Sequence, residues 1–161
     1  MNTPIASFID SYAKKGTLRL HMPGHKGKGP TGTEYADITE IKGADVLSEA
    51  KGIIGESEKN AAEIFMTGAT YYSTEGSSQC ICAMLFLALL EWRRTHRTAS
   101  VRPAVIAARN VHKAFVRAAA LLDFDPIWLS PEDEVYSLTR CRVGRGQLER
   151  VLCETGERAA A

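Results

Sequence analysis

Three residues whose types suit anion binding, Gly76-Ser77-Ser78, stand between a strand-like apolar segment and a strongly apolar helical segment. A glycine at a helix start lets the backbone approach a ligand closely, while hydroxyls and the free N–H groups of the first helical turn attract an anion. The spacing therefore predicts a phosphate site. Ser77 and Ser78 could instead be simple caps of the helix, the commonest role of serine at such a position.

A second run that could do chemistry, Arg109-Asn110-Val111-His112-Lys113, follows the next strand-like segment, 103–108. Two successive strand-to-helix junctions, one with phosphate chemistry and one with an aromatic imidazole, favour a planar phosphorylated cofactor. Considered alone, His112 is more simply an ordinary residue at a helix start.

Two histidines nearer the N-terminus, His21 and His25, have the spacing of zinc ligands on a helix, but Pro23-Gly24 interrupts any helix between them. With no third ligand nearby, we predict no metal site. The glycines between residues 24 and 32 lack the Gly-Lys-Ser/Thr sequence of a P-loop, and no strand leads into a helix there. Asp45 could contact a substrate or cap a turn, and both roles stay open.

The elements that must position these motifs alternate between helix and strand. From apolar spacing and end signals we expect helices over 4–15, 57–66, 77–94 and 112–122, and strands over 69–73, 104–108 and 126–129. This alternation is typical of an α/β fold with a mostly parallel sheet and flanking helices, in which ligands gather at the carboxyl ends of the strands. Segment 80–90 is apolar nearly all round, so we expect its helix to be buried between layers.

Length and charge exclude several classes of protein. The chain has 161 residues and a formal net charge of +1, so nothing indicates a nucleic-acid or membrane partner. The longest apolar run is too short to span a bilayer, and the N-terminus does not have the pattern of a secretory signal. The four cysteines form neither a metal motif nor a disulfide framework, which favours reduced thiols and the cytoplasm.

Several separated motifs occur in the order found in the ornithine/lysine/arginine decarboxylase family, which the chain resembles over residues 3–129. The matching segments are 20–27, 37–40, 52–54, 76–78 and 109–113. The resemblance implies a fold like that of aspartate aminotransferase, pyridoxal 5'-phosphate as cofactor, a basic amino acid as substrate and a homodimer.

The same resemblance implies roles for individual residues. Gly76, Ser77 and Ser78 hold the cofactor phosphate, and His112 stacks on the pyridine ring as a catalytic residue. The loop that contains His25 and Lys26 lies near the substrate or the dimer interface.

The sequence also departs from the family pattern. Glu75 stands where the family commonly has asparagine, and the family's downstream aspartate and Ser-x-His-Lys, with its Schiff-base lysine, do not follow. Segment 146–152 resembles the helix before the family's next strand, which would begin near 159–161. We therefore expect an N-terminal arm and active-site loop over 1–52 and a truncated cofactor-binding domain over 53–161, inactive alone. The alternative is a non-catalytic phosphate-binding or dimerisation module, and the residues do not tell ornithine, lysine and arginine apart.

Overall fold

The computed structural model describes residues 2–97, 100–131 and 141–161. The chain divides into two compact units, Met1–Tyr72 and Ser73–Ala161. The first unit also includes the helix that follows residue 52. The predicted division between an arm over 1–52 and a domain over 53–161 stays a prediction.

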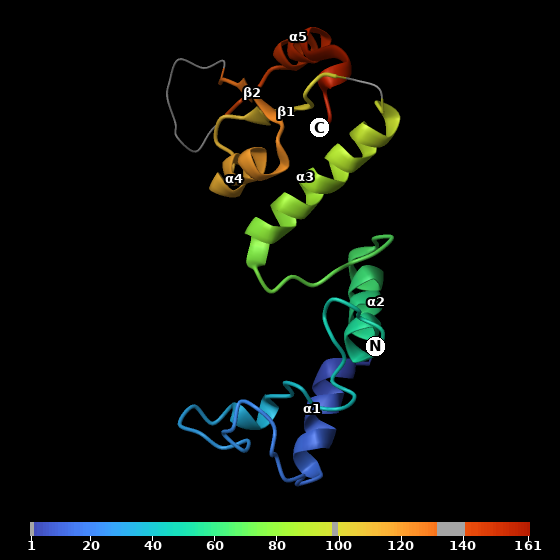
Figure 1. The fold of residues 1–161 in the computed structure, drawn as a ribbon, viewed down its shortest axis with the longest axis vertical. Helices are drawn as coiled ribbons and strands as arrows, with labels where there is room; N and C mark the ends of the chain where they lie inside the picture. The colour runs from blue at the N-terminus through green and yellow to red at the C-terminus, as the bar shows by residue number, and fades with distance from the viewer. Residues whose placement is uncertain (1, 98–99, 132–140) are drawn as a thin grey trace. The chain divides into compact units, whose positions relative to one another are not determined.

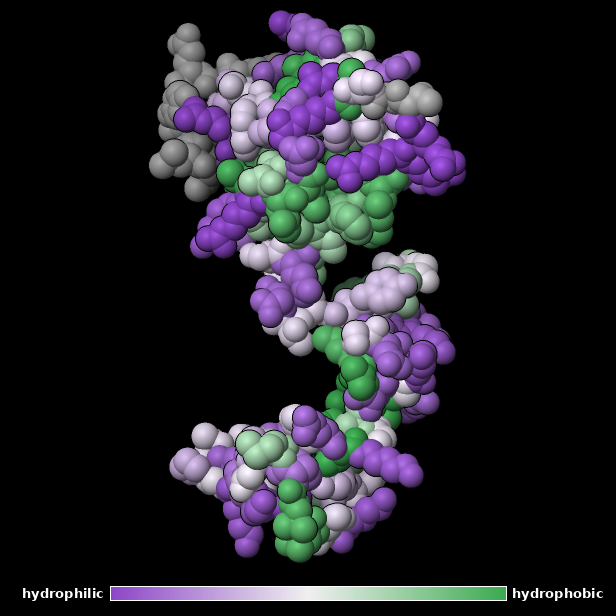
Figure 2. All heavy atoms as spheres, in the orientation of Figure 1, coloured by the Kyte–Doolittle hydropathy of each residue, from purple (hydrophilic) through white to green (hydrophobic). Residues whose placement is uncertain are grey.

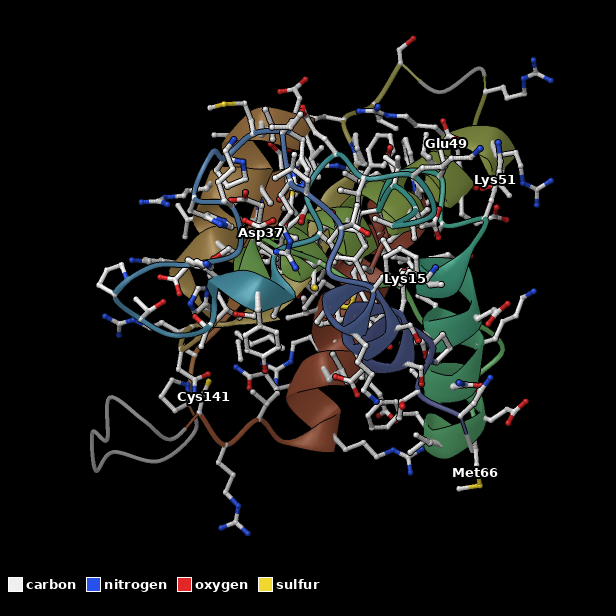
Figure 3. All side chains as sticks on the ribbon, turned by 90° about the horizontal axis from the view of Figure 1, so that it is seen from below. Lys15, Asp37, Glu49, Lys51, Met66 and Cys141 are labelled. Atoms are coloured by element: carbon white, nitrogen blue, oxygen red, sulfur yellow. The ribbon has the colours of Figure 1, made fainter. Side chains whose placement is uncertain are left out.

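The first unit consists of α1 (Pro4–Lys14), the short 3-10 helix η1 (Glu34–Ala36) and α2 (Ile53–Phe65). Pro4 occupies the first turn of α1, where its missing N–H costs nothing, and Gly16 follows the helix with φ +60. Helix α2 ends at Phe65, and Met66, which follows it, adopts a left-handed conformation and projects beyond the last turn (Figure 3). Helices α1 and α2 pack against each other.

The predicted helix 57–66 is present but begins earlier, at Ile53. The reason is a cap from outside the helix, because the Asp45 carboxylate accepts the N–H groups of Gly52 and Ile54 at 2.7 and 3.0 Å. A cap placed so far upstream cannot be recognised from the sequence next to the helix start.

The second unit alternates helices with two strands (Figure 1). Its elements are α3 (Gly76–Thr95), β1 (Ala104–Ala108), α4 (Lys113–Leu122), β2 (Asp125–Leu129), α5 (Arg145–Thr155) and η2 (Gly156–Arg158). The strands are parallel, with Ala104 opposite Asp125 and Ala108 opposite Leu129. The predictions of helix over 77–94 and 112–122 and of strand over 104–108 and 126–129 are confirmed within one or two residues.

The last three residues of the chain lie along the side of β1 opposite to β2. Ala159 forms a parallel bridge with Ala104, and the Ala160 N–H donates to the Ala104 carbonyl at 2.8 Å. The Ile106 N–H in turn donates to the Ala161 carbonyl at 2.9 Å. Strand β1 is therefore paired on both sides, and the expected start of a third strand near residue 159 agrees with this pairing. These findings support an α/β fold.

Strand β2 carries Pro126, whose missing N–H is tolerated at a sheet edge. Asp125 donates its N–H to the Pro103 carbonyl and Leu129 accepts from the Arg109 N–H, so the alternate residue Pro126 faces away from β1.

The core of this unit joins α3, β1, α4 and Phe124, the residue just before β2. Its buried members are Leu89, Val105, Ala107, Phe115, Ala118, Ala119 and Phe124. The rings of Phe115 and Phe124 meet edge to face at 5.5 Å between centroids. Helix α3 enters this core mainly through Leu89, with Cys82 and Leu85 half-buried beside it.

The expectation that helix 80–90 is buried on all sides is wrong for the described residues. Met84 and Leu87 are each 63% exposed, whereas Leu89 is 1% exposed. The helix has two apolar stripes, and among the described residues only the one that contains Leu89 and Trp92 is buried. Leu89 lies in the core with α4 and β1, and the Trp92 indole N–H donates to the Glu157 carbonyl. Figure 2 shows hydrophobic side chains gathered on the surface of this unit where α3 and α4 lie. No described helix is long and apolar enough to cross a membrane.

The strand predicted over 69–73 is also wrong, because this segment has no regular structure. A strand needs a neighbouring backbone, and here the Tyr72 N–H donates to the buried Glu58 carboxylate at 2.8 Å instead. The Tyr72 hydroxyl lies 2.8 Å from the Ser57 hydroxyl, so α2 holds the segment through side chains.

Candidate functional site

The turn that precedes α3 is closed by Ser73. The Ser73 hydroxyl accepts the Glu75 N–H at 3.3 Å and lies 2.6 Å from Oε1 of Gln79. Gly76 has φ +65, which favours glycine, and no atom lies within 4 Å of the position that a Cβ would take. The turn therefore leaves open space at the helix start. The sequence analysis placed Ser73 at the end of the predicted strand 69–73 and did not predict this role, although a serine two residues before a turn N–H is a recognisable turn signal.

The N-terminus of α3 is uncapped. Glu75 occupies the cap position, but its side chain makes no hydrogen bond to the helix. Ser77 and Ser78 are exposed, and neither hydroxyl has a hydrogen-bond partner among the described residues. In this structure the two serines therefore do not cap the helix. The first N–H groups of α3 and two exposed serines thus occur in the same first turn, where an anion would be favoured.

His112 follows the carboxyl end of β1 and caps α4. Its Nδ1 accepts the Ala114 N–H at 3.1 Å, and its backbone is extended, with φ −61 and ψ 143. The interpretation of His112 as a residue of the helix start is thus confirmed. Its ring remains exposed, so the cap does not prevent contact with a ligand.

An open cavity of about 430 Å³ lies at the carboxyl ends of the two strands. Arg109, Trp128 and Ser130 line it, and the Arg109 N–H donates to the Leu129 carbonyl at 3.1 Å. The Trp128 ring meets Phe115 edge to face at 5.6 Å. Space for a ligand therefore lies at the sheet edge where parallel α/β folds bind ligands.

In the first unit, both ring nitrogens of His25 are already engaged. Nε2 lies 3.0 Å from the Asp37 carboxylate, and Nδ1 accepts the Gly27 N–H at 2.9 Å. Asp37 follows η1 (Figure 3) and also accepts the Thr39 N–H. Hydrogen bonds from Thr39 and then from His25 hold the pKa of the Asp37 carboxyl well below its usual value. His25 therefore closes its loop, and no group of three possible metal ligands occurs in the described parts of the chain.

Lys26 lies next to His25 at φ +57, with an exposed side chain. It belongs to the first unit, whereas Gly76, Ser77, Ser78 and His112 belong to the second. The predicted site residues thus fall into two groups, one in each unit.

The sequence did not indicate a role for Arg19, a buried residue that binds the backbone of the segment that contains η1 and Asp37. Its guanidinium donates to the carbonyls of Glu34, Tyr35 and Asp37 at 2.6 to 3.3 Å and lies 4.7 Å from the centre of the Tyr12 ring. Arg19 is 8% exposed. A single arginine in a polar passage carries no sequence signal of such a role.

The open question about Asp45 has a clear answer. Its carboxylate accepts four backbone N–H groups, those of Val46, Lys51, Gly52 and Ile54. Desolvation acts to raise the pKa of Asp45, but these hydrogen bonds outweigh it, and the pKa lies below its usual value. Asp45 therefore caps a turn and the start of α2.

Comparison with known proteins identifies the family of the chain. Residues 3–150 match the model of the Orn/Lys/Arg decarboxylase major domain. The chain is 29% identical to an arginine decarboxylase of Halalkalibacterium halodurans over 140 residues, which cover 81% of this chain and 26% of that protein. It is 28% identical to arginine decarboxylases of Bacillus cereus and Bacillus subtilis, of which it covers 28% and 26%. The chain thus spans about a quarter of the length of these curated relatives. It belongs to the Orn/Lys/Arg decarboxylase family.

Proposed function

We propose that this chain is the N-terminal part of a pyridoxal-phosphate-dependent decarboxylase that acts on a basic amino acid. Arginine is the substrate named for three of the relatives and is the first to test. The observation that carries the proposal is the uncapped N-terminus of α3, with two unpartnered serine hydroxyls among the described residues.

The residues present fit the cofactor's phosphate. Ser77, Ser78 and the first N–H groups of α3 would donate hydrogen bonds to its oxygens, and Gly76 leaves room for close approach. The His112 ring would lie against the flat face of the pyridine. When bound, pyridoxal 5'-phosphate supplies the conjugated system that takes up the electrons left by the loss of carbon dioxide. The residues of this chain would hold the cofactor's phosphate and orient its pyridine ring.

The 161 residues alone are proposed to bind the cofactor without a covalent bond, and to be inactive. Both His-Lys pairs of the sequence, His25-Lys26 and His112-Lys113, belong to the upstream motifs. Glu75 is proposed to weaken binding further, because it occupies the cap position of the helix that would receive the phosphate and carries a negative charge. Glu75→Gln should therefore increase affinity.

Equilibrium titration with pyridoxal 5'-phosphate and with pyridoxal, which lacks the phosphate, tests the phosphate site. Binding should depend on the phosphate, and Ser77→Ala with Ser78→Ala should weaken it at least about tenfold, since hydrogen bonds to charged groups contribute about 1.5–3 kcal/mol each. Ser11→Ala is the matched control, because Ser11 is an exposed serine of the other unit. Equal binding of the two compounds, or an unaffected double variant, would contradict the proposed phosphate site.

Borohydride reduction followed by peptide mapping tests the absence of a covalent bond. No lysine should be labelled stoichiometrically, and a reduced adduct on Lys26 or Lys113 would contradict this part of the proposal.

A second candidate is a non-catalytic phosphate-binding or dimerisation module. The observation that favours it is Glu75 at the cap position of α3, where a carboxylate would repel a bound phosphate. Fusion to the C-terminal portion of the Bacillus subtilis arginine decarboxylase separates the two candidates. Decarboxylation of arginine by the fusion supports the first, and a folded fusion that binds cofactor without turnover supports the second.

A further inference from the structure

The four histidines of the chain differ in which backbone group their Nδ1 contacts. In His112 and His25 the contact is an N–H, from Ala114 at 3.1 Å and from Gly27 at 2.9 Å. A peptide N–H can only donate, so Nδ1 of both rings must carry a lone pair and no proton.

His21 has the opposite arrangement, because its Nδ1 lies 2.7 Å from the Met22 carbonyl. A carbonyl oxygen can only accept, so Nδ1 of His21 carries the proton. Nδ1 of His96 lies 2.9 Å from both the Trp92 carbonyl and the Thr95 hydroxyl, and a hydroxyl can donate or accept, so these contacts do not fix the His96 tautomer. The fold thus sets two different tautomers.

We propose that the Ala114 N–H fixes His112 as the neutral tautomer with its proton on Nε2, so that His112 meets a ligand as a hydrogen-bond donor and an uncharged ring. A role as proton acceptor would need the lone pair on Nε2 and hence a proton on Nδ1. That proton would face the Ala114 N–H, and the cap of α4 would be lost.

His25 has the same tautomer but cannot play this role. Its Nε2–H is directed to the Asp37 carboxylate 3.0 Å away, whereas Nε2 of the exposed His112 has no hydrogen-bond partner among the described residues. Of the two histidines in the predicted site, only His112 offers a free donor. Its partner is expected to be an acceptor oxygen of the ligand. That contact with the cofactor rests on the proposed function, but the tautomer does not.

The test is nuclear magnetic resonance of the full chain with ¹⁵N-labelled histidine at about pH 8.5, where imidazole is ordinarily neutral. Long-range ¹H–¹⁵N spectra distinguish the protonated from the unprotonated ring nitrogen. We expect the proton on Nε2 in His25 and His112 and on Nδ1 in His21, so His25 and His21 serve as internal references for the two tautomers. A proton on Nδ1 of His112, or an even mixture of tautomers, would overturn the inference.

Two proline variants test the cause. Ala114→Pro removes the donor while proline remains tolerated in a first helical turn, and His112 should become a mixture of tautomers. Lys113→Pro is the matched control, because proline is favoured at the first helical position and the extended backbone of His112 suits a residue before proline. It keeps the Ala114 N–H, so His112 should stay as it is. A tautomer unchanged in folded Ala114→Pro would overturn the role of the amide. If that variant does not fold, the spectrum of the unaltered chain still decides.

Adding pyridoxal 5'-phosphate to the labelled chain separates this inference from the proposed function. The His112 Nε2–H signal should shift while its tautomer is retained. No shift on saturation would contradict the proposed contact with the cofactor but not the tautomer, whereas a change of tautomer would overturn the inference itself.

Discussion

Two leucines of α3, two residues apart, should differ widely in their contribution to stability. Leu89 is 1% exposed and belongs to the core with Phe115 and Phe124, whereas Leu87 is 63% exposed on the second apolar stripe. Leu89→Ala and Leu87→Ala make the same chemical change in the same helix. Helix propensity therefore cancels between the two variants, and burial remains as the difference.

The magnitude follows from the atoms removed. Replacing a fully buried leucine with alanine loses about 2.4 kcal/mol of transfer free energy, at about 0.8 kcal/mol per buried carbon group, and the cavity left behind adds to this. We expect about 3 kcal/mol for Leu89→Ala. Because Leu87 is 63% exposed, it loses about a third of the transfer free energy and leaves no cavity, so we expect about 1 kcal/mol or less.

Tryptophan fluorescence during urea unfolding measures this difference in the relevant unit. The chain has two tryptophans, Trp92 and Trp128, and both belong to the second unit. Leu18→Ala is a suitable control, because Leu18 is exposed in the first unit and its loss should not change this transition. Each variant should be measured at several protein concentrations, since self-association through the exposed stripe would make the cost of Leu87→Ala depend on concentration.

Equal losses for the two leucine variants would refute the assignment of Leu87 to an exposed face. A loss below about 1 kcal/mol for Leu89→Ala would refute the core itself, because a buried leucine normally costs at least about 2 kcal/mol when truncated to alanine.

Three further outcomes follow from single side chains. Because the pKa of Asp37 is lowered in the folded chain, its hydrogen bonds stabilise the loop fully above the unfolded pKa of about 3.9. This stabilisation is lost as the pH falls toward the folded pKa. Asp37→Asn should therefore remove this pH dependence of the free energy of unfolding below about pH 4. Asp45→Ala should shorten α2 and lower the far-ultraviolet helix signal, whereas Asp45→Asn, which keeps an acceptor oxygen, should lose less; equal losses would contradict the cap. Arg158 bonds to the Asp125 carboxylate, so Arg158→Met should loosen the C-terminal residues and speed hydrogen exchange at the Ile106 N–H, and unchanged protection there would contradict this anchoring.

Local patterns predicted most of the second unit. Segments 104–108 and 126–129 are short, apolar and bounded by turn residues, and both became strands, because each pairs with the other in parallel. The strand predicted over 69–73 has the same kind of sequence but no described backbone beside it. A strand forms only where two backbone segments pair in register, and the sequence of one segment does not reveal whether a partner segment lies beside it.

The burial of α3 was overestimated for a related reason. Apolar residues on all sides indicate that a helix suits burial, not which of its faces finds a partner among the residues present. The stripe of Leu89 and Trp92 is covered, and that of Met84 and Leu87 is not.

The residues of the proposed site stay predictions, and the structure contains supporting contacts around them that the sequence did not predict. A glycine followed by two serines at a helix start is a local pattern, and the structure indeed has an open turn there. Arg19 and Asp45 act over long separations, on Glu34 to Asp37 and on Ile54. Their roles depend on how distant segments meet, which spacing along the chain does not encode.

The position of the turn before α3, the proposed phosphate site, depends on the far end of that helix. Trp92 is buried and donates its indole N–H to the Glu157 carbonyl at 2.7 Å, so the C-terminal half of α3 is held both by the core and by the residues after α5. Gly76 lies at the other end of a helix of 20 residues, ~30 Å long, whose first turns contribute little to the core. Since a helix is stiff along its axis, a small tilt at Leu89 moves the N-terminal hydroxyls by much more. The packing of Leu89 against α4, the helix that His112 caps, is therefore what relates the two halves of the proposed cofactor site to each other.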